Sequence, residues 1–339
     1  GRGLGDELSW CYNNHMSFAH KIRVGVLRGG PSPEYEVSLN TGKTILANLP
    51  EEYEPLDVFI SRDGAWHTAG LEKSPYQILK TIDVTVNALH GAYGEDGAVQ
   101  KLLENFGIPY TGSDSMASAL GMSKVMSKNI FNLYGLKTPQ YIVVDKGENQ
   151  NILIKKINES LPFPIIIKPL NSGSSLGVSF VEKVGDIKNA LKKSFEHSPE
   201  LIVEEFINGK EVTCGVIEGF RGQNFYTLLP VEINPHHAFF DYNSKYKNLE
   251  SRYKIPSNFR EDEKMEIQKA AGLIHQALGL RHYSRSDFIL HPKRGLFVLE
   301  VNTLPELSHR SSFIKSLEAV GGNIKEFLSH LLSKTLERK

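Results

Sequence analysis

The chain has 339 residues, 40% of them hydrophobic, which is enough to build the cores of two or three ordinary domains. Lysine plus arginine and aspartate plus glutamate number 39 each, so net charge gives no reason to expect nucleic acid or an anionic membrane as a partner. No apolar run approaches the roughly 20 residues of a membrane helix and no stretch has the pattern of a signal peptide, so we expect a cytoplasmic protein.

The first predicted domain begins after residues 1–19, which show no hydrophobic periodicity and which we expect to be a disordered leader outside the fold. KIRVGVLRGG is a compact apolar strand that breaks at a glycine pair, and the residues after it have the apolar spacing of a helix. This order predicts a small open-sheet α/β domain over 20–112, with ligands at its glycine-rich strand ends. Its other predicted elements are strands at 55–61 and 84–91 and a helix over 97–109.

The second predicted region, residues 113–207, has a different pattern of elements. SKVMSKNIFNLYG predicts a helix that ends at Gly135, because glycine commonly follows the last helical residue. FPIIIKPLNSGSSLGVSFVEKV predicts a β-hairpin with a glycine- and serine-rich loop, and LIVEEFI predicts a strand that closes the region.

The third predicted region, residues 208–339, begins with the strand EVTCGVIEG and continues through an extended polar segment over 236–256. A long helix is predicted over 261–278, and the strand pair YSRSDFIL and GLFVLEVN follows it. The last helix is predicted from apolar residues that recur with helical spacing, at Ile324, Phe327, Leu328, Leu331 and Leu332.

The loop NSGSSLG, at 171–177, follows Lys168 on a predicted strand. Small residues let backbone N–H groups approach an anion closely, and a nearby lysine suits a phosphate. The loop lacks the GxxxxGK[ST] pattern, so a P-loop nucleotide site is not indicated. Lys124 in MSKVMSK is a candidate for a second phosphate ligand. Taken alone, the loop also fits a flexible hairpin turn, and Lys124 also fits a solvated surface lysine.

The last two predicted strands carry polar side chains on matching faces. Because alternate residues of a strand share a face, Arg285 lies beside Asp287, and Glu300 lies beside Asn302. Paired as a hairpin, these strands would present a guanidinium, two carboxylates and an amide to one spot. Hard oxygen ligands suit magnesium beside a substrate phosphate, and arginine suits a phosphoryl group or a developing oxyanion. The alternative is a surface hairpin with a salt bridge, which the apolar flanks disfavour because they bury the strands.

Nine motifs follow one another along the chain: GGPSPEYEVSL, LHGAYGEDG, GIPYTGSD, MSKVMSK, IIIKPLNSGSSLGVS, VEEFINGKEVT, FDYNSKY, SRSDF and EVNTLP. In this order and spacing they closely resemble the D-alanine–D-alanine ligases of the ATP-grasp superfamily, over about residues 21–335. The resemblance implies a three-domain α/β (α+β) ATP-grasp fold. An N-terminal open parallel-sheet domain over 20–112 would precede two domains that clamp ATP, a central one over 113–207 with the glycine-rich hairpin and a C-terminal one over 208–339 with the metal site and a mobile loop.

The resemblance also implies which residues bind ATP and metal. Lys124 and Lys168 would contact the phosphates, and Arg285 would stabilise the transferring phosphate and the later tetrahedral centre. Two Mg²⁺ ions, which Mn²⁺ could replace, would be held by Asp287, Glu300 and Asn302. The other implied ATP-binding residues are Ser175 in the glycine-rich loop, Lys245 at the γ-phosphate, and a hinge for adenine and ribose formed by Glu204, Phe206, Ile207 and Glu211.

The amino-acid site implied by the resemblance lies on the N-terminal side. Glu36 would take the ammonium group of the first D-alanine, in a pocket that is also lined by His90 and Glu95. Ser174 and Tyr246 resemble the partners of that glutamate, and closing this trio would exclude water from a reactive acyl phosphate. The implied contacts of the second D-alanine are Ser311 and Ser312.

The implied activity is the ADP-forming ligation of two D-alanines into D-alanyl-D-alanine through D-alanyl phosphate, a carbon–nitrogen ligase reaction of peptidoglycan and cell-wall synthesis that supports cell shape. Tyr246 favours a dipeptide product, because ligases that make an ester-ended product lack this tyrosine loop. The expected partners are D-alanine and ATP, with no nucleic acid and no membrane, and a homodimer follows from the resemblance alone.

The sequence departs from its relatives near the end of the last motif. Glu306 stands where glycine is common, and the backbone N–H of that glycine is a plausible oxyanion donor. Ser311 matches the serine that usually contacts the second carboxylate, whereas Ser312 replaces a customary leucine and Arg310 is new. These differences leave two alternatives open: an ATP-grasp ligase that joins D-alanine to a different acceptor, and a nucleotide-binding protein without turnover.

Overall fold

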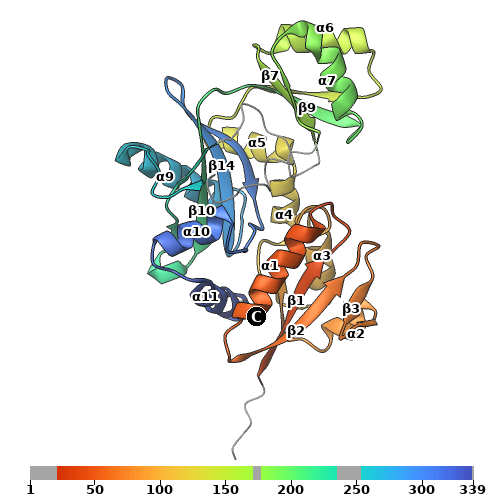
Figure 1. The fold of residues 1–339 in the computed structure, drawn as a ribbon, viewed down its shortest axis with the longest axis vertical. Helices are drawn as coiled ribbons and strands as arrows, with labels where there is room; N and C mark the ends of the chain where they lie inside the picture. The colour runs from red at the N-terminus through yellow and green to blue at the C-terminus, as the bar shows by residue number, and fades with distance from the viewer. Residues whose placement is uncertain (1–20, 171–176, 235–252, 338–339) are drawn as a thin grey trace, which may run out of the picture.

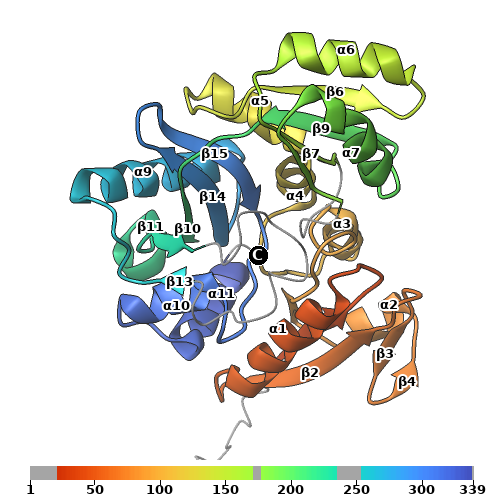
Figure 2. The ribbon, with the colours of Figure 1, turned by 45° about the horizontal axis from the view of Figure 1, so that its top comes forward.

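The computed structural model describes residues 21–170, 177–234 and 253–337 as three β-sheets with helices packed on them (Figure 1). Figure 2 shows α4 (Ser115–Met122) in the middle of the molecule, between the three sheets. The expectations for the leader over 1–19 and for four candidate site residues lie outside the described residues: Ser174, Ser175, Lys245 and Tyr246. Among the helices of the described ranges, none has the length and apolar composition needed to cross a membrane.

The N-terminal sheet has the strand order β4-β3-β2-β1-β5. Strand β1 pairs in parallel with β2 and β5, which confirms the predicted open parallel sheet, and β3 and β4 extend its edge in the antiparallel direction. The short strands β3 and β4 were not predicted, because two or three residues carry too little periodicity. The bounds are β1 Ile22–Gly29, α1 Tyr35–Asn48, β2 Tyr53–Ile60, β3 Trp66–Thr68, β4 Leu71–Glu72, α2 Pro75–Leu79, β5 Val84–Asn87 and α3 Ala98–Asn105.

A glycine turn sets the path from β1 into α1. Gly29 has a φ of 95°, and a Cβ atom there would collide with the carbonyl oxygen of Ile60 on β2. Only glycine adopts such a conformation without strain, which explains why the predicted strand stops at the glycine pair. The turn places the start of α1 beside the carboxyl end of β5, where open α/β sheets bind ligands.

The second sheet is antiparallel, with the order β6-β9-β7-β8, and its core is shared with α6 and α7 (Figure 1). The pairing of β7 with β8 confirms the predicted hairpin. The bounds in this region are α5 Lys124–Leu133, β6 Tyr141–Asp145, α6 Gln150–Ser160, β7 Ile165–Pro169, β8 Ser179–Val181, the 3₁₀ turn η1 Val184–Asp186, α7 Ile187–Ser194 and β9 Glu200–Glu205.

The third sheet has the order β13-β12-β10-β14-β15, with β11 paired to β10, and it confirms the predicted pairing of the last two strands. Helices α4, α5 and α9 share one core with this sheet, through residues such as Ala117, Phe131 and Phe288. The bounds are β10 Lys210–Glu218, η2 Phe220–Gly222, β11 Phe225–Thr227, β12 Val231–Ile233, β13 Tyr253–Lys254, α9 Glu261–Ala277, β14 Tyr283–His291, β15 Gly295–Asn302, α10 Ser312–Ala319 and α11 Ile324–Glu337.

The last two helices join the first and third sheets. Phe313 of α10 and Phe327 of α11 belong to the same buried cluster as Val24 of β1 and Val86 of β5. This shared core holds the carboxyl ends of β1 and β5 opposite β14 and β15. The three sheets fall within the three predicted domain ranges, while the domain boundaries themselves stay predictions.

Candidate active site

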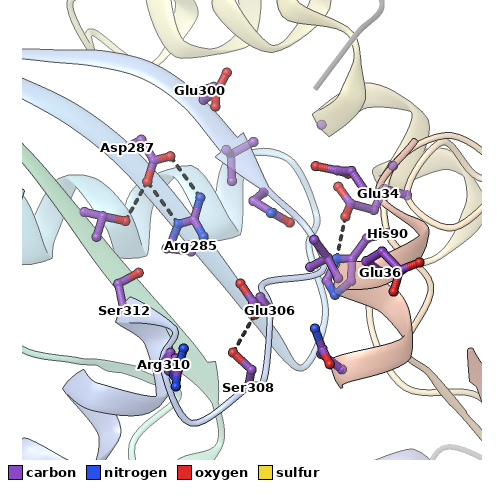
Figure 3. A pocket seen from close by; sticks show the side chains of 18 of the residues that line it. Glu34, Glu36, His90, Arg285, Asp287, Glu300, Glu306, Ser308, Arg310 and Ser312 are labelled. Carbon is purple, nitrogen blue, oxygen red and sulfur yellow. Dashed lines mark hydrogen bonds and ion pairs between the residues drawn. The ribbon is translucent and has the colours of Figure 1, made fainter. Parts of the chain in front are cut away.

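A cavity of about 910 Å³ lies between the N-terminal sheet and the third sheet (Figure 3). Its walls come from the turn after β1, α1, the loop after β5, the α4–α5 junction, β10, β14, β15 and the start of α10. Ten of the predicted site residues line it: Glu36, His90, Glu95, Lys124, Glu211, Arg285, Asp287, Glu300, Asn302 and Ser312.

The N-terminal wall contains a buried histidine held by two partners. His90 Nδ1 lies 3.0 Å from Glu95 Oε1, and His90 Nε2 lies 3.0 Å from Thr41 Oγ1. Burial opposes charge on the imidazole, but the carboxylate of Glu95, followed by those of Glu34 and Glu306, raises the pKa of His90. This wall is therefore acidic and fixed in position, which suits the ammonium group of an amino acid.

Glu36 lies at the mouth of the same wall, in the first turn of α1. Its side chain is 73% exposed, and its carboxylate forms an ion pair with Arg62 at 3.4 Å. An exposed pair of this kind contributes little to stability, so Glu36 can exchange this contact for a ligand. The two partners expected for Glu36 lie outside the described residues.

The opposite wall is formed by β14 and β15. Their register sets Arg285 against Asn302 and Asp287 against Glu300, so all four polar side chains occupy neighbouring positions of the hairpin. The ladder shifts register after Asp287, where a β-bulge re-aims the strand. Buried residues such as Phe288 and Val298 anchor the hairpin in the core, so it is not the surface hairpin that the sequence left as an alternative.

Arg285 and Asp287 form a salt bridge within this wall. The Arg285 guanidinium donates two hydrogen bonds of 3.0 Å to the Asp287 carboxylate, and Thr213 donates a third to that group at 2.5 Å. Burial opposes charge on Arg285, but Asp287 raises the pKa of Arg285 above its ordinary value. The guanidinium is thus permanently charged and faces the cavity in a fixed orientation.

The oxygen donors of this wall fit a magnesium ion that is shared with a substrate phosphate. Asp287 and Glu300 supply carboxylates, and Asn302 supplies an amide oxygen that already accepts a hydrogen bond of 2.8 Å from the Leu304 N–H. No group of three or more histidine, cysteine or acidic residues fit to hold a metal occurs among the described residues. A site with two carboxylates that completes its shell with phosphate oxygens and water is typical of magnesium.

Lysines approach the cavity from the second sheet and α5. Lys124 begins α5 and lines the cavity, and its Nζ donates a hydrogen bond of 3.4 Å to the Leu170 carbonyl. Burial lowers the pKa of Lys124 to about 8, although the charge of Glu300 partly offsets this effect. Lys124 is therefore not the solvated surface lysine that the sequence left as an alternative.

Of the four predicted hinge residues, Glu211 lines this cavity, whereas Glu204, Phe206 and Ile207 do not. Glu204 is buried at the end of β9, and its carboxylate pairs with Lys168 at 2.7 Å. Phe206 packs edge-on against Phe180 at 5.1 Å, and Ile207 is buried. The structure does not place Lys168 or Ser311 among the residues that line the cavity either.

Lys128 is a charged residue of this region that the sequence analysis missed. Its ammonium group is fully buried, lies 2.9 Å from the Glu204 carboxylate and stands over the Tyr141 ring at 5.5 Å. Burial alone would raise the pKa of Glu204, but the two lysines together lower it and keep the carboxylate charged. The sequence signal was the spacing of Lys124 and Lys128, four residues apart on one helix face.

Two family models match the chain. "D-ala D-ala ligase N-terminus" matches residues 23–81 and 70–113, and "D-ala D-ala ligase C-terminus" matches residues 130–333. A D-alanine–D-alanine ligase of Geobacillus thermodenitrificans is 33% identical, over 94% of this chain and 96% of its own length. One from Citrifermentans bemidjiense is 38% identical, over 86% of this chain and 88% of its own.

Solved structures give the same result. The D-Ala:D-Ser ligase VanG of Enterococcus faecalis superposes with a TM-score of 0.80 at 28% identity, and covers 93% of this chain and 99% of its own. The D-alanine–D-alanine ligase of Bacillus anthracis, solved in complex with ATP, has a TM-score of 0.77 at 31% identity. The match covers 93% of this chain and 98% of the Bacillus anthracis chain. Fold and sequence therefore agree over nearly the whole length of both chains.

Proposed function

The chain belongs to the D-alanine–D-alanine ligase family, and we propose that it joins two D-alanine molecules into D-alanyl-D-alanine with ATP as the energy source. The observation that carries this proposal is the cavity that sets the β14–β15 polar residues opposite the acidic wall of His90 and Glu95. One wall suits a phosphoryl group and the other suits an amino acid, so the reacting groups can meet between them.

In the first step the carboxylate of one D-alanine attacks the γ-phosphate of ATP, which gives D-alanyl phosphate and ADP. Glu36 receives the ammonium group of this D-alanine, and the pair of His90 and Glu95 orients it. Lys124, at the start of α5, and Lys168, on β7 of the second sheet, contact the phosphates. Asp287, Glu300 and Asn302 would hold magnesium, which would neutralise the charge of the phosphate oxygens.

In the second step the amine of another D-alanine attacks the acyl carbonyl, and phosphate leaves. Arg285 carries a permanent positive charge beside the reacting centre and stabilises the oxyanion that forms. The start of α10, at Ser311 and Ser312, is the proposed contact for the carboxylate of this second D-alanine. The end of β15 and the start of α10 thus lie on either side of the proposed acceptor position.

The purified protein with ATP, magnesium and D-alanine tests the proposal. We expect ADP, phosphate and D-alanyl-D-alanine in equal amounts, and no ADP without D-alanine. A panel of second amino and hydroxy acids, each supplied with limiting D-alanine, measures acceptor choice. If phosphate release required an acceptor other than D-alanine, the proposed product would be wrong.

We also propose that the reaction serves peptidoglycan precursor synthesis in the cytoplasm and that the protein works as a homodimer. These parts rest on the family alone. Sedimentation equilibrium of the purified chain measures the assembly state, and a mass of one chain at micromolar concentration would contradict the dimer.

A further inference from the structure

We propose that Glu306 is the base that takes a proton from the acceptor amino acid before its nitrogen attacks the acyl phosphate. This inference rests on the proposed ligase function and adds a catalytic group to its second step. Glu306 lines the cavity, and none of the roles described above uses its carboxylate.

The second step requires such a group. An amino acid reaches the site at neutral pH as an ammonium ion, whose nitrogen has no lone pair with which to attack a carbonyl. The hydroxyl groups of Ser311 and Ser312, at the proposed acceptor site, are too weakly basic to remove that proton. A positioned carboxylate within hydrogen-bond reach can remove it.

The chain path places Glu306 where the two substrates meet. Glu306 lies in the loop that runs from Asn302, on the phosphate side, to Ser311, the cap of α10 on the acceptor side. The acceptor nitrogen has to sit between these two sides to reach the acyl carbonyl. Figure 3 shows the Glu306 side chain in the cavity between Arg285 and His90.

The neighbours of Glu306 fix its orientation. Ser308 Oγ donates a hydrogen bond of 2.5 Å to Glu306 Oε1, and Leu304 and Leu307 anchor the loop on either side with exposures of 3% and 0%. Among the described residues, none donates a hydrogen bond to the other carboxylate oxygen, Oε2. One oxygen is thus held by Ser308, and within the described part of the chain the second is available to a ligand.

Charged side chains of both signs surround Glu306 in the cavity. His90, Glu34 and Glu95 face it from the N-terminal wall, Arg285 faces it from β14, and Arg310 lies on its own loop. The acidic wall attracts the incoming ammonium group.

The step balances without a further reactant. An N–H bond of the acceptor ammonium breaks, and its proton passes to Glu306. The nitrogen lone pair then forms the C–N bond at the acyl carbonyl, and the bond from that carbon to the phosphate oxygen breaks. The nitrogen then loses a second proton to become the amide, so that one proton goes to the departing phosphate and the other to water, and no electron transfer is involved.

Hydroxylamine provides the test, because its nitrogen is unprotonated at neutral pH and attacks an acyl phosphate without a base. The wild type and Glu306→Gln are compared with ATP, magnesium and D-alanine, once with D-alanine as the acceptor and once with hydroxylamine in excess. We expect the dipeptide rate of the variant to fall by about 100-fold or more. We expect its D-alanyl hydroxamate rate to stay within about twofold of the wild type.

The matched control is Glu54→Gln, on an exposed position of β2, which should leave both rates unchanged. If Glu306→Gln lowered both rates equally, Glu306 would have a structural role only, and if it lowered neither, the assignment would be wrong. If the wild type itself formed neither dipeptide nor hydroxamate, the proposed ligase function would fail instead.

Discussion

The buried lysine Lys128 pairs with Glu204, beside the lysine that is proposed to contact the phosphates of ATP. Glu204 lies between two lysines, at 2.9 Å from Lys128 and 2.7 Å from Lys168. With Lys128 present, Lys168 can turn toward a phosphate while Glu204 keeps a counter-charge. Without Lys128, Glu204 would hold Lys168 in place, because a buried carboxylate without a partner destabilises the fold.

Lys128→Met should therefore raise the KM for ATP by about tenfold and change kcat less. In this variant Lys168 would be the remaining lysine partner of Glu204, and turning toward a phosphate would leave the buried carboxylate unpaired. Initial rates over a range of ATP concentrations measure this split. Lys155→Met, at a side chain that is 76% exposed, is the matched control. An unchanged KM for ATP in Lys128→Met would show that Lys168 does not need this counter-charge.

His90 gives a prediction on pH and stability. The pKa of His90 is raised in the fold, although burial opposes this, because Glu95 favours the charged ring. The contribution of the His90–Glu95 pair to the free energy of unfolding is therefore complete below the pKa of an unfolded histidine, about 6.5. It is lost as the pH rises through the pKa of His90 in the folded protein. The difference in free energy of unfolding between the wild type and His90→Gln should shrink as the pH rises, as denaturant titrations at several pH values can measure. If this difference in free energy of unfolding did not change with pH, a stabilising charged pair of His90 and Glu95 would be excluded.

At the scale of elements, the start of α10 combines a structural and a proposed functional role. Ser311 caps this helix, because its Oγ accepts a hydrogen bond of 3.2 Å from the Ile314 N–H. The same helix end is the proposed contact for the acceptor carboxylate, and a helix N-terminus favours an anion. Substitutions of Ser311 can separate its role as a helix cap from its proposed role as an acceptor contact.

Ser311→Ala should lower the free energy of unfolding by about 1 kcal/mol and also weaken acceptor binding, because it removes the cap and the contact together. Ser311→Asp keeps a capping group but places a negative charge against the acceptor carboxylate. We expect near wild-type stability and a larger rise in the acceptor KM. Equal acceptor KM values in the wild type and Ser311→Asp would exclude this contact.

Elements with strong local patterns could be predicted from the sequence, and those without them could not. The β14–β15 pair was predicted because alternating apolar residues flank Asp287 and Glu300, and the structure pairs these two residues directly. Helix α10 and the edge strands β3, β4 and β13 were missed because such short elements carry too little periodicity of their own. The burial of Lys128 could not be predicted either, because it depends on the pairing of α5 with Glu204 of the second sheet.

At the scale of the whole molecule, the cavity exists because one core joins distant parts of the chain. Val24 of β1 and Phe327 of α11 pack in the same cluster, and this contact sets the N-terminal wall against the third sheet. Family resemblance named the residues of both walls, but it gave no distances between them. Those distances follow from the shared core, which no local pattern reveals.

ATP with magnesium should bridge the sheets and stabilise the whole molecule. At a ligand concentration of about 100 times Kd, the free energy of unfolding should rise by about 2.7 kcal/mol. Glu300→Ala and Asn302→Ala should lose the part of this gain that depends on magnesium, and should lose turnover with it. Denaturant unfolding with ATP, with and without magnesium, measures the effect. Near-normal turnover of Glu300→Ala at ordinary magnesium concentrations would show that the metal assignment is wrong.

The most direct test of the proposed chemistry follows one oxygen atom. D-Alanine labelled with heavy oxygen in its carboxylate is supplied with ATP and magnesium, and the phosphate released is analysed by mass spectrometry. If a carboxylate oxygen attacks the γ-phosphate and D-alanyl phosphate forms, each phosphate released should carry one labelled oxygen for each D-alanyl-D-alanine made. Unlabelled phosphate released together with dipeptide would contradict the acyl phosphate and the central role given to this cavity.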